Sequence, residues 1–220
     1  IIVPLSFAAS LFAPQYFYPY LFMRSFADLG EMLKLIGIEL PEIPKRKAVE
    51  ERFMYYWSLC EIFTHIREKY CLSHEELNVF LYDFLPYCSS KQPEELPRPT
   101  QCWFIGGLIN ASVGYENESW QVNVDTRPGD ILLHYETAPK SAVTTIWQAE
   151  SNGYTDPFFH WHSCAKIGKR IDVPHITLAE LRNDKLFSGV PIVRKNFQGV
   201  NGTRVEAEVY NRLLLSLIHI

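Results

Sequence analysis

Asn196-Phe-Gln-Gly-Val-Asn-Gly-Thr203 is the stretch around which we expect the fold of this chain to be organised. It is a polar, glycine-containing turn that carries an aromatic residue. Polar turns that present aromatic side chains between strands are typical of a small β-barrel with a binding pocket at its mouth. Three earlier stretches are of the same kind: Trp120-Gln-Val-Asn-Val-Asp-Thr-Arg-Pro-Gly-Asp130, Thr155-Asp-Pro-Phe-Phe-His-Trp161 and Pro174-His-Ile-Thr-Leu-Ala-Glu-Leu181.

The residues between these turns predict strands, because they are apolar and rich in β-branched types. Gly106-Gly107 follows the first strand and predicts a turn or a close backbone approach there. Thr177 with Glu180 predicts a capped helix over 178–184, and Thr203 with Glu206 predicts another over 205–214. The sum is an α+β domain, a strand-rich barrel with short helices. The predicted strands are 102–105, 130–135, 142–149, 160–167 and 169–173.

The first part of the chain predicts a helical unit. Apolar residues recur at helical spacing over 16–37 and 45–69, and Ser73 with Glu76 opens a third helix that Pro86 should stop. The buried stripe of the second helix should contain Phe53, Tyr56, Trp57, Cys60, Phe63 and Thr64, and Leu77, Phe80, Leu81 and Phe84 of the third should face inward. The polar, proline-rich residues 89–99 are the expected linker. We therefore divide the chain into a helical region, 1–95, and a barrel, 100–214.

Both ends of the sequence require separate interpretation. Residues 1–23 carry no charge, but three prolines interrupt them and no basic segment precedes them, so we expect a packed strand and turn and no membrane anchor. Because the first residue is Ile1, we expect the sequence to begin inside a longer protein. Residues 215–220 resemble the translation of a transposon-derived sequencing adapter, and we leave them out of the fold prediction.

Charge and cysteine content limit the partners and the compartment. The net charge of the 220-residue chain is -4, and neither half is basic, which argues against wrapping a long duplex and leaves room for a small basic patch around one nucleotide. The five cysteines form no CxxC pair, which favours reduced thiols in a cytoplasmic protein.

The order of five elements resembles the EVE domain, a branch of the PUA-like superfamily that includes YTH and ASCH domains. The resemblance implies a small barrel whose pocket takes a flipped nucleobase, often a modified one, and prokaryotic members are often restriction-associated. Two segments depart from the family pattern, Gly106-Gly107-Leu108 and Trp120–Asp125, which bears on ligand identity more than on fold. The five elements are Cys102-Trp-Phe-Ile105, Arg127-Pro-Gly-Asp-Ile-Leu-Leu-His-Tyr135, Ile146-Trp-Gln-Ala-Glu-Ser-Asn-Gly-Tyr-Thr-Asp-Pro157, Pro174–Leu181 and Arg194-Lys-Asn-Phe-Gln-Gly-Val200.

A pocket for an unpaired base needs aromatic faces for stacking and polar groups for the base edge. The candidate stacking residues are Trp103, Trp120, Tyr135 and Trp161. The candidate edge readers are Asn123, Asp125, Asn196 and Gln198. The candidate phosphate contacts are Lys166, Lys169, Arg170, Arg194, Lys195 and Arg204. The alternatives are that the tryptophans are core residues, that Asp125, Asn196 and Asn201 only shape turns, and that the basic residues form a solvated face.

The sequence lacks a recognisable catalytic or metal signature. His160-x-His162-x-Cys164 would lie on one strand face, but neighbours on that face are about 7 Å apart, so we predict no metal site and no cofactor. Walker A, Gly-x-Ser-x-Gly and His-Glu-x-x-His motifs are absent. The first hypothesis is a non-catalytic nucleic-acid reader that prefers modified DNA to RNA. A protein–protein adaptor that uses the helical region is the alternative, and an enzyme would need an open pocket lined by His160, His162 and Asp156.

Overall fold

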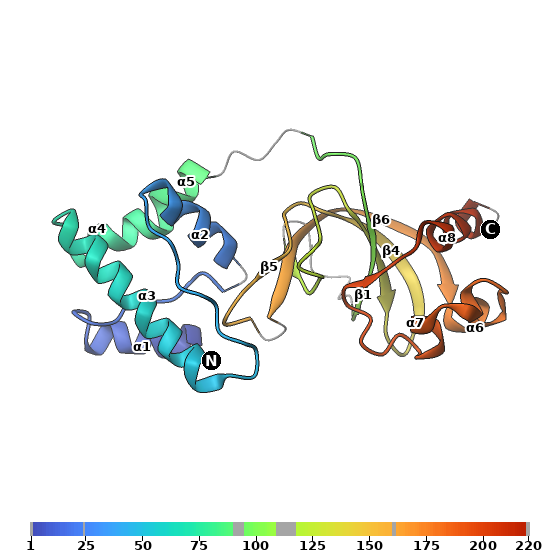
Figure 1. Ribbon diagram of the computed structural model, residues 1–220, viewed down its shortest axis with the longest axis horizontal. Coiled ribbons are helices and arrows are strands. Elements are labelled where there is room, and N and C mark those ends of the chain that lie inside the picture. The colour runs from blue at the N-terminus through green and yellow to red at the C-terminus, as the bar shows by residue number, and fades with distance from the viewer. Residues whose placement is uncertain (1, 24, 90–94, 109–117, 160–161, 219–220) are drawn as a thin grey trace. The chain divides into compact units, whose positions relative to one another are not determined.

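The computed structural model describes the chain except residues 1, 24, 90–94, 109–117, 160–161 and 219–220 (Figure 1). The chain forms two compact units. The helical unit holds residues 1–94 together with 155–162, and the sheet unit holds 95–154 and 163–220. The short segment 155–162 thus belongs to the helical unit, although the sequence placed it in a continuous barrel.

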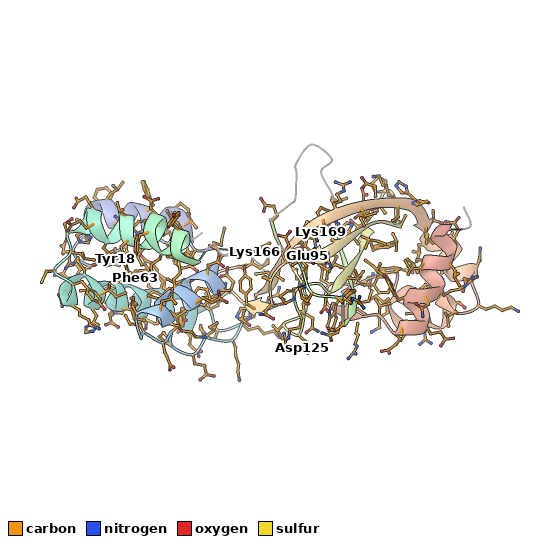
Figure 2. The ribbon with its side chains drawn as sticks, turned by 90° about the horizontal axis from the view of Figure 1, so that it is seen from above. Tyr18, Phe63, Glu95, Asp125, Lys166 and Lys169 are labelled. Atoms are coloured by element: carbon orange, nitrogen blue, oxygen red, sulfur yellow. The ribbon has the colours of Figure 1, made fainter. Side chains whose placement is uncertain are left out.

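Aromatic side chains fill the core of the helical unit. Tyr18 is fully buried and packs edge-on against Phe63 at 5.7 Å between ring centroids (Figure 2). Phe158, from the inserted segment, lies 4.7 Å from the ring of Tyr20. The elements of this unit are α1 (Ile2–Phe12), α2 (Phe26–Leu35), α3 (Val49–Lys69), α4 (His74–Val79), the π-helical turn η1 (Phe80–Phe84) and α5 (Leu85–Ser89).

Three local predictions for this unit were wrong. The segment predicted to form an N-terminal strand forms the helix α1. This helix tolerates Pro4 because first-turn N–H groups need no partner within the helix. The helix predicted over 16–37 is only α2, since residues 17–22, which include Pro19, have no helical structure and the helix begins at Phe26. Pro86 does not stop the third helix, because the hydrogen-bond ladder widens at η1 and helical backbone continues through α5.

The buried stripes of α3 and α4 also differ in part from the prediction. Phe53 is 60% exposed and Phe84 is 55% exposed, whereas the capping box of Ser73 and Glu76 forms as expected. Each residue advances 100° around the helix axis, so an error of one position in the predicted buried face places a side chain on a different side of the helix. The residues of α3 that are buried are Tyr55, Tyr56, Leu59, Cys60, Phe63 and Ile66.

The sheet unit is α+β, with one curled, mixed sheet (Figure 1). The strand order is β2-β6-β4-β3-β1-β7, with β5 also paired to β6. β1 and β3 run parallel, and the other pairs with printed registers are antiparallel. The strands are β1 (Cys102–Gly107), β2 (Glu118–Trp120), β3 (Ile131–Glu136), β4 (Ala142–Ala149), β5 (Tyr154–Thr155), β6 (Ser163–Thr177) and β7 (Thr203–Arg204). The helices are α6 (Leu178–Asn183), the 3-10 turn η2 (Phe187–Gly189), α7 (Pro191–Arg194) and α8 (Ala207–Ile218).

The two faces of the sheet bury different side chains, because successive residues of a strand point to opposite sides. One face, here called the helix-covered face, packs Phe104, Leu133 and Val143 against residues of α6, α7 and α8. Figure 1 shows these three helices gathered on one side of the sheet. The other face, here called the tryptophan face, consists of Trp103, Ile105, Val122, Leu132, Trp147, Ala149, Ala165 and Ile167, with Trp120 against it.

β6 replaces the two strands predicted over 160–167 and 169–173. It runs through Gly168 and Lys169 without ending, because a β-bulge absorbs the irregularity. Lys169 has a φ of 49°, and the pairing with β4 shifts register between Ile146 and Gln148. The last helix also begins later than predicted, at Ala207, since Thr203 pairs with Phe104 in β7.

Candidate nucleic-acid interface

The Pro-Gly-Asp turn is a structural hub of the sheet unit. The carboxylate of Asp130 is fully buried and accepts hydrogen bonds from Gln101 N at 3.0 Å and Arg127 N at 2.9 Å. It also accepts from the indole Nε1 of Trp103 at 3.2 Å and from both donors of Thr100. These bonds tie the turn before β3 to the start of β1, so Asp130 positions the strand on which Trp103 lies.

The glycine pair after β1 allows the close approach that the sequence predicted. A Cβ atom on Gly106 would lie 2.4 Å from Cγ1 of Val200, and one on Gly107 would lie 2.8 Å from Cζ2 of Trp120. Asn201 holds the neighbouring turn in place, because its Oδ1 accepts from Gly106 N at 2.7 Å. Both approaches need a residue without a side chain.

Trp120 is the candidate stacking residue that retains exposed surface among those described. It lies on β2, at the edge of the sheet, opposite Ala165 of β6. Its ring covers Gly107 and meets the imidazole of His134 edge-on, with 5.5 Å between ring centroids. A partly exposed indole on an edge strand can offer a ring face to a ligand.

The other described tryptophans of the sheet are core residues. Trp103 is 3% exposed and Trp147 is 2% exposed. The indole N–H of Trp103 donates to Asp130, and that of Trp147 donates to Oγ1 of Thr145 at 2.9 Å. Trp161 lies outside the described residues, so its expected stacking role stays a prediction.

Tyr135 lies on the opposite face of the sheet from Trp120. Its ring stacks on Phe197 at 3.9 Å between centroids and 4° between planes, within the core of the helix-covered face. Tyr135, a candidate stacking residue, therefore does not lie on the same face as Trp120. The reason is the odd spacing between Leu132 and Tyr135, which puts their side chains on different faces.

The predicted edge readers are engaged in turns. Asn123 accepts from Asp125 N at 2.9 Å and donates to the carbonyl of Gly202 at 3.2 Å. Asp125 is exposed on that same turn, and its carbonyl accepts from the side chain of Gln101. Asn196 has a φ of 54° and accepts a hydrogen bond from Arg182. Gln198 is exposed in the turn that follows α7.

The predicted phosphate contacts form separate groups. Lys166, Lys169 and Arg170 lie along β6, whereas Arg194 and Lys195 lie at the end of α7. Arg204 lies on β7, opposite Trp103. Figure 2 shows Lys166 and Lys169 well apart from Asp125.

The β6 group lies on the strand that pairs with the strand of Trp120. β2 pairs with β6, and Ser119 lies opposite Lys166. The guanidinium of Arg170 lies 5.6 Å from the ring centroid of Trp147, which places it on the tryptophan face, and it pairs with Asp172 at 2.7 Å. Trp120 and these cations thus lie on two neighbouring strands, β2 and β6.

His134 is the residue of this region that the sequence analysis did not select as a reader. It lies on β3, two residues after Leu132, and is 1% exposed. Neither ring nitrogen has a hydrogen-bond partner among the described residues. Burial lowers the pKa of His134 to about 4, an effect that Glu136 opposes and Arg170 reinforces. The signal in the sequence is a single histidine inside an apolar strand.

The described residues of the His160-His162-Cys164 motif have other contacts. His162 bonds the carbonyl of Pro44 through Nε2 at 3.1 Å, and Cys164 is buried in β6. Asp156 accepts from the backbone N–H groups of Phe158 and Phe159, so its carboxylate shapes its own loop. His160 lies outside the described residues. Within the part of the chain that the structure describes, no group of three or more His, Cys, Asp or Glu residues is placed to hold a metal ion.

The cysteines whose side chains are described form no disulfide bond with one another; they are Cys60, Cys71, Cys102 and Cys164. None of the helices that the structure describes has the length and apolar composition needed to cross a membrane.

Comparisons with known proteins find likeness to solved structures. The chain matches no family model and no curated protein. It is similar to a Rhodopseudomonas palustris protein solved by NMR, with a TM-score of 0.46 and 15% identity, over 55% of this chain and 94% of that one. For an Agrobacterium tumefaciens crystal structure the TM-score is 0.45 and the identity 14%, over 53% and 92% of the two chains. For the YTH domain of a Zygosaccharomyces rouxii protein, solved in complex with N6-methyladenosine RNA, the values are 0.36 and 14%, over 57% and 92%.

Proposed function

We propose that the sheet unit is a non-catalytic nucleic-acid-binding domain that holds one unpaired nucleobase against Trp120. The observation that carries this proposal is the partly exposed indole of Trp120, which rests on Gly107 beside a strand with three basic side chains. Asn123 and Asp125, which follow it in the chain, are engaged in turn hydrogen bonds, which favours binding over catalysis.

Stacking and charge supply the affinity in this proposal. A base stacked on an aromatic ring gains about 1–3 kcal/mol, and every base has a face that can stack. Lys166, Lys169 and Arg170 would contact the phosphates on either side of that base. Arg170 lies on the tryptophan face, whereas Lys166 is one residue out of phase with Trp120 across the β2–β6 pair. A strand that crosses the β2 edge would meet cations on both sides of the sheet.

Three finer features of the proposal come from the EVE-domain resemblance: a flipped, modified base, DNA in preference to RNA, and a restriction-associated role. The proposed cytoplasmic location comes from the cysteine content. We also keep Trp161, which lies outside the described residues, as a proposed stacking residue.

Titration of labelled oligonucleotides by fluorescence anisotropy tests this function. The ligands are short single-stranded and duplex DNA with modified or unmodified cytosine or adenine, and matched RNA, at low salt. We expect saturable binding that Trp120→Ala weakens by about 10- to 100-fold, since that substitution removes the stacking surface.

Trp57→Ala is the matched control. Trp57 lies on α3 of the helical unit, where its indole donates to Glu61 at 3.0 Å. This variant should bind like the wild type. Binding by no oligonucleotide, or equal binding by folded Trp120→Ala, would overturn the proposed function.

An adaptor function through the helical unit is the second candidate. The observation in its favour is the apolar surface of α1, on which Phe12 is 90% exposed and Leu11 is 67% exposed. Exposed apolar patches of this kind mark protein-interaction sites. We expect a Leu11→Ser/Phe12→Ser variant to lose a specific protein partner that Trp120→Ala retains, as measured by quantitative affinity capture. Equal capture by both variants would count against it.

A further inference from the structure

His134 is a buried polar side chain whose hydrogen-bonding capacity is unused. It is 1% exposed, and neither Nδ1 nor Nε2 has a partner among the described residues. Such a group lowers stability, because it gives up its hydrogen bonds to water without replacing them. Asp130, on the same strand's entry turn, shows the usual situation, since its buried carboxylate meets several donors. A buried polar group without a partner requires an explanation, and a ligand that supplies the missing hydrogen bond is one.

The surroundings of His134 place it beside the proposed stacking residue. The ring of Trp120 meets the imidazole edge-on at 5.5 Å, and Trp120 is itself partly exposed. Two charged groups affect the pKa of His134, namely Glu136 and Arg170. Glu136 pairs with Lys140 at 2.9 Å, and Arg170 pairs with Asp172. Glu136 and Arg170 thus have partners of their own, whereas the imidazole nitrogens have none among the described residues.

We propose that His134 reads the hydrogen-bonding edge of the nucleobase that stacks on Trp120, and that Trp120 moves to admit it. This inference rests on the proposed function and adds to it the residue that distinguishes one base from another, His134. A neutral imidazole carries one N–H donor and one acceptor nitrogen, and neither tautomer is held by a neighbour. The ligand class is a base with a polar edge, as opposed to any flat aromatic ring.

Base analogues that stack but lack a polar edge separate reading from stacking. The probes are oligonucleotides in which the target position holds thymine or its isostere 2,4-difluorotoluene, and adenine or its isostere 4-methylbenzimidazole. We expect the wild type to bind at least one natural base about tenfold or more tightly than its isostere, because the isostere leaves the imidazole unpaired. In His134→Leu this preference should disappear, while binding of the isostere is retained.

His175→Leu is the matched control, since His175 is exposed on β6, and it should keep the wild-type preference. If His134→Leu does not fold, His134→Phe, which also lacks a polar edge, and the imidazole ¹⁵N shifts of the wild type replace it. The ¹⁵N shifts of His134 should change with the natural base and not with the isostere. A preference that survives in His134→Leu, or a wild type that binds without preference, would overturn this inference and leave the proposed function standing. Binding of no oligonucleotide would overturn both.

Discussion

At the scale of single residues, Asp130 and His134 show two uses of a buried polar side chain. The Asp130 carboxylate is surrounded by donors from Gln101, Trp103 and Arg127, so it organises the turn. His134 is buried to nearly the same degree without a partner among the described residues. The first arrangement stabilises the fold, and the second lowers stability at a place where a ligand could restore it.

Removal of the Asp130 side chain should destabilise the sheet unit strongly. Asp130→Ala leaves the indole of Trp103 and two or more backbone N–H groups without acceptors, which we expect to cost about 3 kcal/mol or more. Urea unfolding followed by circular dichroism measures this. Asp125→Ala, an exposed turn residue, is the control and should change the free energy of unfolding by less than about 0.5 kcal/mol. Similar values for both variants would show that the hub is not structural.

His134 should also make stability depend on pH. Burial lowers its pKa from 6.5 to about 4, so the unfolded chain binds a proton below about pH 6.5 that the folded chain does not. The free energy of unfolding should then fall as pH drops from about 6.5 to about 4, by about 1.4 kcal/mol per pH unit, with the full contribution present above pH 6.5. Urea unfolding at pH 7, 6 and 5 should give a smaller pH slope for His134→Gln than for the wild type. His74, whose pKa burial also lowers, is common to both proteins and cancels. Equal slopes would contradict the buried state of His134.

At the scale of elements, β1 and β2 form the proposed site together, because Gly107 of β1 has no side chain and leaves room for the ring of Trp120 of β2. The ring of Trp120 occupies the space beside Gly107 that a Cβ atom would need. β2 contributes only three residues to the sheet edge, so its position depends on this contact and on its pairing with β6. The edge strand is therefore sensitive to small changes in its neighbour.

Gly107→Ala should displace Trp120 and weaken nucleic-acid binding. The added Cβ would lie 2.8 Å from Cζ2 of the indole, so the ring must shift, at a cost to stability of about 1 kcal/mol because Trp120 is partly exposed and can move. Oligonucleotide anisotropy and tryptophan emission spectra measure the two effects. Gly189→Ala is the control, since a Cβ there meets no atom within 4 Å. Unchanged affinity with Gly107→Ala would argue against Trp120 as the platform.

At the scale of the whole molecule, the chain forms two units that are not two continuous stretches. Residues 155–162 leave the sheet unit and belong to the helical unit. There, Phe158 lies 4.7 Å from Tyr20 and 6.3 Å from Tyr55 between ring centroids, and Arg52 donates to the carbonyl of Pro157 at 2.5 Å. The helical unit is thus completed by a segment distant in sequence.

Phe158→Ala should destabilise the helical unit selectively. The substitution removes a partly buried ring from an aromatic cluster, and we expect a loss of about 1–3 kcal/mol. Amide hydrogen exchange should accelerate in α2 and α3 and stay unchanged in β3 and β4. Tyr87→Ala, at an 81% exposed position of the same unit, is the control. Equal acceleration in both units would contradict this assignment of 155–162.

The modest charge of the chain sets the salt dependence of the proposed binding. With a net charge of -4 and three basic residues on β6, we expect about three phosphate contacts, so log K should fall with log salt concentration with a slope of about -2 for a single strand. Lys169→Ala should reduce the slope by about 0.7, and Lys195→Ala, at the end of α7, should not change it. A slope insensitive to Lys169 would place the phosphates elsewhere.

The sequence by itself determined the features that depend on neighbouring residues. The capping boxes at Ser73 and Thr177, the turn at 128–129 and the bounds of β4 could be predicted because their physical causes lie within a few residues. The tertiary structure alone decided which side chains share a face and which keep a free polar atom. Tyr135 faces away from Trp120, and the side-chain amide of Asn123 donates a hydrogen bond to the carbonyl of Gly202. His134 has no hydrogen-bond partner among the described residues. Each of these outcomes depends on strand register and on groups distant in sequence, and local pattern contains neither.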